Sequence, residues 1–141
     1  MKPNELMLGD WVTFKDCQFD NPMPIKMIAI GYQDGEENCL VQINGDDACD
    51  IIAIDDEIVG IPLTPEILEK NGFTRPNVRV QYFTESTDYY DVDIHEITDS
   101  IWCFEYQNCK AHFPPCLILI AHVHELQHAL RLCGIEKEIT I

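Results

Sequence analysis

The sequence is poor in basic residues: it holds 9 lysines and arginines against 25 aspartates and glutamates, a formal net charge of −16. A chain this acidic repels the phosphate backbone of nucleic acids, so direct binding to DNA or RNA is not expected. The same surplus would suit a protein partner with a basic surface. Two alternatives are a chain that is merely soluble and acidic, and an acidic decoy that imitates nucleic acid in the groove of a nucleic-acid-binding protein.

Long hydrophobic runs are also missing. The longest, residues 116–121, is about a third of the roughly 20 apolar residues that a membrane-spanning helix needs. The opening stretch MKPNELMLGDW has neither the apolar core nor the small-residue cleavage site of a secretory signal peptide. We therefore expect a cytoplasmic protein with no membrane partner. Nothing in the sequence predicts its oligomeric state.

Several motifs of catalysis and cofactor binding are absent. There is no G-x-S-x-G, no phosphate-binding P-loop and no G-x-G-x-x-G, so the sequence predicts no cofactor. No cysteine pair has the C-x-x-C spacing of a metal or redox motif. We expect reduced thiols that are packed as small hydrophobic side chains, with a metal site assembled from distant cysteines and histidines as the alternative. The seven cysteines are Cys17, Cys39, Cys49, Cys103, Cys109, Cys116 and Cys133.

The first 63 residues read as short strands separated by turn signals. Apolar or β-branched runs occupy residues 11–14, 25–32, 39–43, 51–54 and 57–61. Five short strands at close spacing are typical of a small SH3-like β-barrel or a curled sheet. We predict such a subdomain for residues 1–63.

A short helix is predicted at about residues 64–71. Thr64 can cap its start, Pro65 suits the first helical position and Lys70 lies in the last turn. Gly72 can adopt the left-handed conformation that ends a helix, after which Phe73 would fold back onto the helix.

Residues 64–141 are predicted to form an α+β subdomain. Strands are expected over about residues 78–106, with a hairpin at 84–88. Val92, Ile94 and, as an option, Ile97 would face one side, and Asp91, Asp93 and His95 the other. A helix is expected at about 121–133 and a final edge strand at 138–141. The fold class is therefore α+β, with the two subdomains forming one compact unit.

The segment 124–128, HELQH, matches the H-E-x-x-H pattern of zinc proteases. In that pattern His124 and His128 would bind the metal, and Glu125 would act as the general base. His95, His112 or His122 could supply a third ligand, or Asp91 or Asp93 an oxygen.

Three observations favour a solvated helix face instead of a zinc site. The predicted helix ends at Gly134 and no downstream histidine follows. At 100° per residue both histidines lie opposite the apolar side of the helix, so we expect them to face outward. The charge of Arg131, three residues beyond His128, would also weaken cation binding. We therefore assign no catalytic, cofactor-binding or metal-binding residue, and keep the zinc-dependent hydrolase as an alternative.

Three stretches carry a resemblance to a known family. They are MKPNELMLGDWV at 1–12, IPLTPEILEKNGF at 61–73 and HVHELQHALRLCGIEKEITI at 122–141. Together they resemble a family of short, mostly uncharacterised β-rich proteins of Bacteroides-type bacteria and their phages or mobile elements. The resemblance implies a non-enzymatic cytoplasmic protein, which we interpret as a protein-interaction module of such an element. The zinc hydrolase and the acidic decoy remain the alternatives.

Overall fold

The computed structural model describes residues 5–15, 25–33, 36–43, 50–53, 58–76, 82–110 and 114–141. By its internal contacts the chain divides into two units, Met1–Ile61 and Pro62–Ile141. The predicted boundary, between residues 63 and 64, lies two residues further along the chain. Each unit contains an antiparallel sheet, and the helices accompany the second sheet, so the fold class is α+β as predicted.

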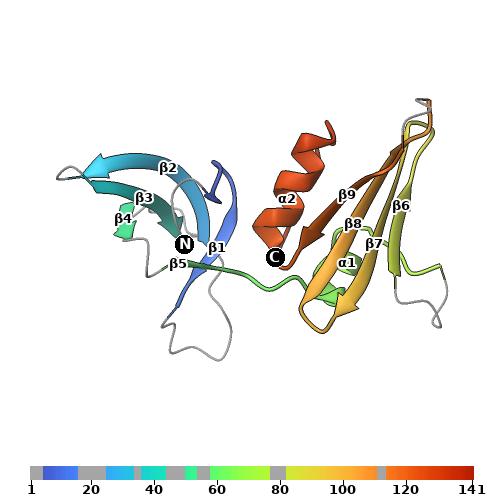
Figure 1. Ribbon diagram of the computed structural model, residues 1–141. Coiled ribbons are helices and arrows are strands. Elements are labelled where there is room, and N and C mark those ends of the chain that lie inside the picture. Colours follow the sequence, from blue (N-terminus) through green and yellow to red (C-terminus); the bar gives the residue numbers. More distant parts are fainter. Residues whose placement is uncertain are drawn as a thin grey trace. The chain divides into compact units, whose positions relative to one another are not determined.

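The first unit contains a five-stranded antiparallel sheet with the order β4-β3-β2-β1-β5. Its strands are β1 (Trp11–Phe14), β2 (Ile25–Gln33), β3 (Glu36–Ile43), β4 (Asp50–Ala53) and β5 (Ile58–Gly60) (Figure 1). All five predicted strands are confirmed to within a few residues. Among the described residues no pairing joins β4 to β5, so the sheet does not close there and the SH3-like barrel stays a prediction.

The predicted short helix is confirmed as α1 (Pro65–Lys70). Thr64 is its N-cap, and the Thr64 hydroxyl accepts a hydrogen bond from the Ile67 backbone N–H at 3.4 Å. Gly72 ends the turn with φ at 83°, a conformation that favours glycine. The Phe73 N–H then donates to the Leu68 carbonyl at 3.1 Å, and the Phe73 ring is fully buried.

The second unit is built on a four-stranded antiparallel sheet with the order β6-β7-β8-β9. Its strands are β6 (Tyr82–Ser86), β7 (Tyr90–Thr98), β8 (Ile101–Asn108) and β9 (Cys116–Ile120). The segment that forms β9 lies outside the strands predicted over about residues 78–106. It is a strand because it pairs with β8 from Trp102 opposite Ile120 to Tyr106 opposite Cys116. Such pairing between distant segments leaves no local signal in the sequence.

One face of this sheet carries the core of the second unit. Its buried residues are Phe83, Val92, Ile94, Trp102, Phe104 and Ile120. The last helix, α2 (Val123–Leu132), follows β9 directly and runs beside it (Figure 1). The apolar side of α2 is buried, as the spacing at 100° per residue predicts. Its buried residues are Val123, Leu126, Ala129 and Leu130.

The alternation along β7 is confirmed at Val92 and Ile94, but the optional place of Ile97 on the same side is wrong, because Ile97 is 55% exposed. Ile97 lies an odd number of residues from Val92 and Ile94, so alternation with period 2 places it on the opposite side. The irregularity in the pairing of β7 with β8 between Glu96 and Thr98 does not return it to the core.

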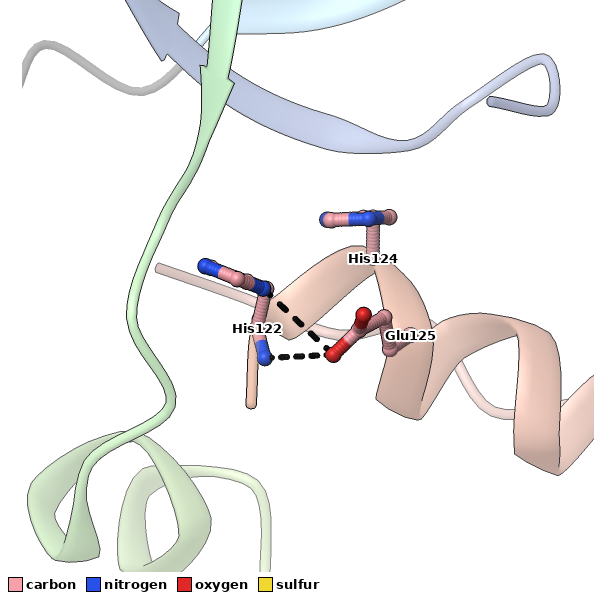
Figure 2. A group of neighbouring side chains, drawn as sticks. All are labelled: His122, His124 and Glu125. Carbon is pink, nitrogen blue, oxygen red and sulfur yellow. Dashed lines mark hydrogen bonds and ion pairs between the residues drawn. The ribbon is translucent and has the colours of Figure 1, made fainter. Parts of the chain in front are cut away.

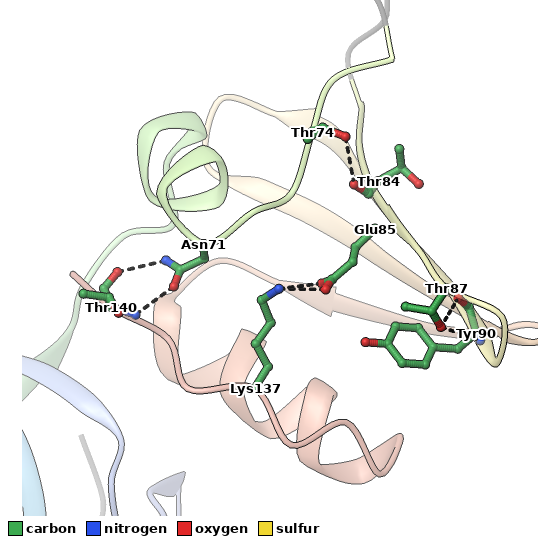
Figure 3. A network of polar contacts seen from close by, with 8 residues as sticks. All are labelled: Asn71, Thr74, Thr84, Glu85, Thr87, Tyr90, Lys137 and Thr140. Atoms are coloured by element: carbon green, nitrogen blue, oxygen red, sulfur yellow. Dashed lines mark hydrogen bonds and ion pairs between the residues drawn. The ribbon is translucent and has the colours of Figure 1, made fainter.

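The final edge strand predicted at 138–141 is absent: residues 135–141 form no strand. Contacts made by side chains hold this segment instead (Figure 3). Asn71 donates from Nδ2 to the carbonyls of Ile67 and Thr140, at 2.8 and 2.9 Å, and accepts from the Thr140 N–H at 2.8 Å. Lys137 reaches both carboxylate oxygens of Glu85 on β6 at 2.8 Å. These contacts fix the tail against α1 and the sheet.

The expected burial of the cysteines is not found. The four described cysteines are free thiols, and all are exposed or half-buried: Cys103, Cys109, Cys116 and Cys133. Cys103 alternates with the buried Trp102 and Phe104, so it lies on the side of the sheet that points away from the core. Cys109 lies in a turn after β8, Cys116 begins the edge strand and Cys133 caps the end of α2. The side chains of Cys17, Cys39 and Cys49 lie outside the described residues.

Candidate functional site

The HELQH segment lies at the start of α2, but its two histidines do not form the closest cluster of potential metal ligands. His124 and His128 contact each other edge-to-face, with ring centroids 5.8 Å apart. His122, the N-cap residue of α2, stacks on His124 with centroids 5.5 Å apart and ring planes at 24°. Among the described residues, the potential ligand atoms that gather within 4.8 Å of one another belong to His122, His124 and Glu125 (Figure 2).

Glu125 turns back toward the N-terminus of its own helix. Its Oε2 accepts hydrogen bonds from the backbone N–H groups of Ala121, at 2.5 Å, and of His122, at 3.0 Å. Burial alone would raise the pKa of Glu125, but these two hydrogen bonds and the imidazoles of His122 and His124 lower it below its ordinary value. A carboxylate in this role is a helix cap, and its lowered pKa makes it a poor general base.

The prediction that the histidines face solvent is wrong for His124, of which 4% is exposed. Rings on both sides account for part of this burial, since His122 stacks on one side and His128 packs on the other. His128 is half-buried, and Arg131 is exposed as expected. The spacing of residues at 100° around the helix identified the apolar side of α2 correctly. It could not show that rings on the polar side cover one another.

The other predicted ligands are dispersed. His95 lies on β7, where its ring packs on Tyr82 with centroids 5.2 Å apart and its Nε2 lies 3.7 Å from Glu105 Oε2. Asp91 and Asp93 lie on the same strand. His112 lies outside the described residues. Of the candidates for a third ligand that the structure describes, only His122 joins the cluster at the start of α2.

The face of the second sheet that points away from the core is a second candidate site. Along one row Tyr82 lies opposite His95, which lies opposite Cys103 and then Leu119. In the next row Thr84, Asp93, Glu105 and Leu117 lie side by side across the four strands. We call this surface the open face. It carries acidic groups in its middle and exposed leucines on β9.

A depression of about 290 Å³ lies within the open face. It is lined by Tyr82, Thr84, Ser86, Asp91, Asp93, Glu105 and Gln107. The lining contains three carboxylates and no lysine or arginine. Asp93 and Glu105 are direct cross-strand partners, an arrangement that is destabilising for like charges.

Sequence reasoning found only part of these two sites. The alternation along β7 identified Asp91, Asp93 and His95 as one side of a strand. It could not place Glu105 and Tyr82 next to them, because that requires the register of three strands. The N-cap role of His122 was also missed, because histidine is not among the residues preferred at that position.

None of the helices in the described part of the chain is long and apolar enough to cross a membrane. Comparisons with protein-family models, with curated proteins and with solved structures gave no match for this chain.

Proposed function

We propose that the protein is a non-enzymatic interaction module, and that the open face of its second sheet binds a basic segment of a partner protein. The observation that carries the proposal is the direct pairing of Asp93 with Glu105 inside an open depression. A cross-strand pair of like charges costs on the order of 0.2–1 kcal/mol. A bound lysine or arginine would turn that repulsion into attraction, because it would lie between two carboxylates.

The surroundings of the depression define the partner further. Leu117 and Leu119 on β9 are 62% and 66% exposed and lie in the same two rows as the acidic and aromatic side chains. A partner that covers them must itself carry apolar side chains. The chemistry of the open face therefore fits an extended segment that combines lysine or arginine with aliphatic residues.

The charge of the whole chain supports the same conclusion. A formal net charge of −16 attracts a basic partner from a distance and raises the rate at which the two proteins meet. Binding of this kind weakens as the ionic strength rises. The resemblance to proteins of Bacteroides-type bacteria, phages and mobile elements supports a cytoplasmic partner encoded by the host or by the element.

The proposal can be tested by affinity capture with three baits from one host lysate. The first bait is the wild-type chain, and the second carries Asp93→Asn and Glu105→Gln. The third carries Glu96→Gln and Asp99→Asn, which remove the same number of charges from exposed positions of the same hairpin. We expect the wild type and the third bait to capture a common partner that salt elutes, and the second bait to lose it.

Either of two results would contradict the proposal. Capture that is equal for all three baits would mean that the open face is not the binding surface. Absence of any salt-sensitive partner would mean that the chain is not an interaction module of this kind. Competition by DNA for the captured protein would favour the acidic decoy, because a decoy and nucleic acid share one groove.

The zinc-dependent hydrolase has less support from the geometry. In the H-E-x-x-H mechanism the glutamate must be available to accept a proton from a metal-bound water. Here Oε2 of Glu125 is hydrogen-bonded to two backbone N–H groups, and the carboxylate caps α2.

A further inference from the structure

We propose that His122, His124 and Glu125 form a binding site for one borderline transition-metal dication, Zn²⁺ or its spectroscopic substitute Co²⁺. The site would be assembled from the residue before α2 and from its first turn. It differs from the zinc-protease arrangement, because it uses His122 in place of His128 and takes Glu125 as a ligand. It is independent of the open face.

The first support is geometric. A tetrahedral zinc site with bonds of about 2.0–2.1 Å holds its ligand atoms roughly 3.3 Å apart. His122 Nδ1 and Glu125 Oε2 already lie 3.4 Å apart, and all the potential ligand atoms lie within 4.8 Å of one another (Figure 2). Modest rotation of the half-buried His122 side chain would bring the remaining atoms closer to the separation that a metal requires.

The second support is a polar atom without a hydrogen bond. His122 Nδ1 is buried and makes no hydrogen bond; its contact with Glu125 Oε2, at 3.4 Å, is an ion-pair contact. Leaving a buried polar group unsatisfied costs about 1–3 kcal/mol. Coordination of a metal through this nitrogen would remove that cost, since a neutral imidazole binds through its lone pair.

The third support comes from the orientation of Glu125. The hydrogen bonds from the Ala121 and His122 N–H groups both end on Oε2 and fix the carboxylate beside the two imidazoles. Hydrogen bonds of this kind to a ligating carboxylate orient it and increase its affinity for the metal.

The helix dipole opposes the site, but local charge offsets it. The N-terminus of a helix carries a partial positive charge equivalent to roughly half an elementary charge. The full negative charge of Glu125 lies nearer to the metal, and its hydrogen bonds already neutralise part of the dipole's positive end. Two imidazoles and one carboxylate are ligands that suit zinc, and they leave a fourth position for water.

The test is a titration of the full chain with Co²⁺, followed by absorption spectroscopy in the presence of a reductant that does not bind metal. We expect one Co²⁺ per chain, with visible d–d bands and without the intense near-ultraviolet band that a cysteine thiolate would add. His122→Ala and His124→Ala should each weaken binding at least about tenfold. Glu125→Gln should do the same, although its amide oxygen can still accept the backbone hydrogen bonds.

Two variants serve as controls. His128→Ala removes the second histidine of the H-E-x-x-H pattern, and His95→Ala removes a histidine of β7; both should bind Co²⁺ within about twofold of wild type. Thermal unfolding without metal verifies that each variant folds. Loss of binding in His128→Ala with retention in His122→Ala would overturn the proposal in favour of the protease arrangement. A thiolate band, or no stoichiometric binding by the wild type, would also overturn it.

Discussion

Asn71 is the side chain whose removal should destabilise the second unit most clearly without creating a large cavity. It makes three hydrogen bonds, one to the last turn of α1 and two to the backbone of Thr140, and it is 9% exposed (Figure 3). Each such bond contributes roughly 0.5–1.5 kcal/mol. Because Thr140 is exposed, water can replace part of the hydrogen bonding that its backbone loses. We therefore expect Asn71→Ala to lower the free energy of unfolding by about 2 kcal/mol.

For a unit of this size, a loss of about 2 kcal/mol lowers the midpoint of thermal unfolding by roughly 8–16 °C. The fluorescence of Trp102, which is buried in the second unit, can report this transition if Trp11, the other tryptophan, is replaced by phenylalanine in every variant. Asn108→Ala is the matched control. The Asn108 Oδ1 accepts one exposed hydrogen bond from the Lys110 N–H, at 2.9 Å, so its loss should cost well under about 1 kcal/mol. Equal effects of the two substitutions would refute the reasoning.

Three further predictions concern the same unit. A double-mutant cycle on Lys137→Met and Glu85→Gln should give a coupling free energy of about 1–2 kcal/mol, since both side chains are about one-fifth exposed; a coupling near zero in urea denaturation would contradict this. Burial, together with the nearby Cys116, raises the pKa of Cys133 to about 11. At about pH 8, iodoacetamide should therefore alkylate Cys133 at least about tenfold more slowly in the native chain than in the denatured chain, as measured by mass spectrometry. Glu125→Ala should lower the free energy of unfolding by about 1 kcal/mol above about pH 4.5. This difference from wild type should vanish as the pH falls through the lowered pKa of Glu125 in the folded state. A difference that persists in acid would show that the charge of Glu125 is not what stabilises α2.

Much of the local structure could be predicted from the sequence. The helix at 65–70 carries its signals within a few residues: a capping threonine, a proline at the first position and a glycine at the end. The apolar side of α2 follows from spacing alone. In both cases the physical cause is local, because helix ends and helix faces are set by neighbours along the chain.

The remaining features depend on contacts between distant segments. The strand β9 exists through its pairing with β8. The open face needs the register of all four strands, so the pairing of Asp93 with Glu105 could not be predicted. The side-chain contacts that hold residues 135–141 replace the expected strand, and they join positions 52 to 71 residues apart.

The same long-range contacts should govern how fast the second unit forms. Leu63 donates from its N–H to the Ala121 carbonyl, and Asn71 binds Thr140, so the second unit is held by contacts between residues as far as 69 positions apart in the sequence. Contacts with such wide spacing along the chain slow folding, typically to milliseconds or seconds. During synthesis the last of them can form only after residue 140 has left the ribosome. The second unit would then complete its fold later than the first, whose shorter pairings can form while the rest of the chain is still being made.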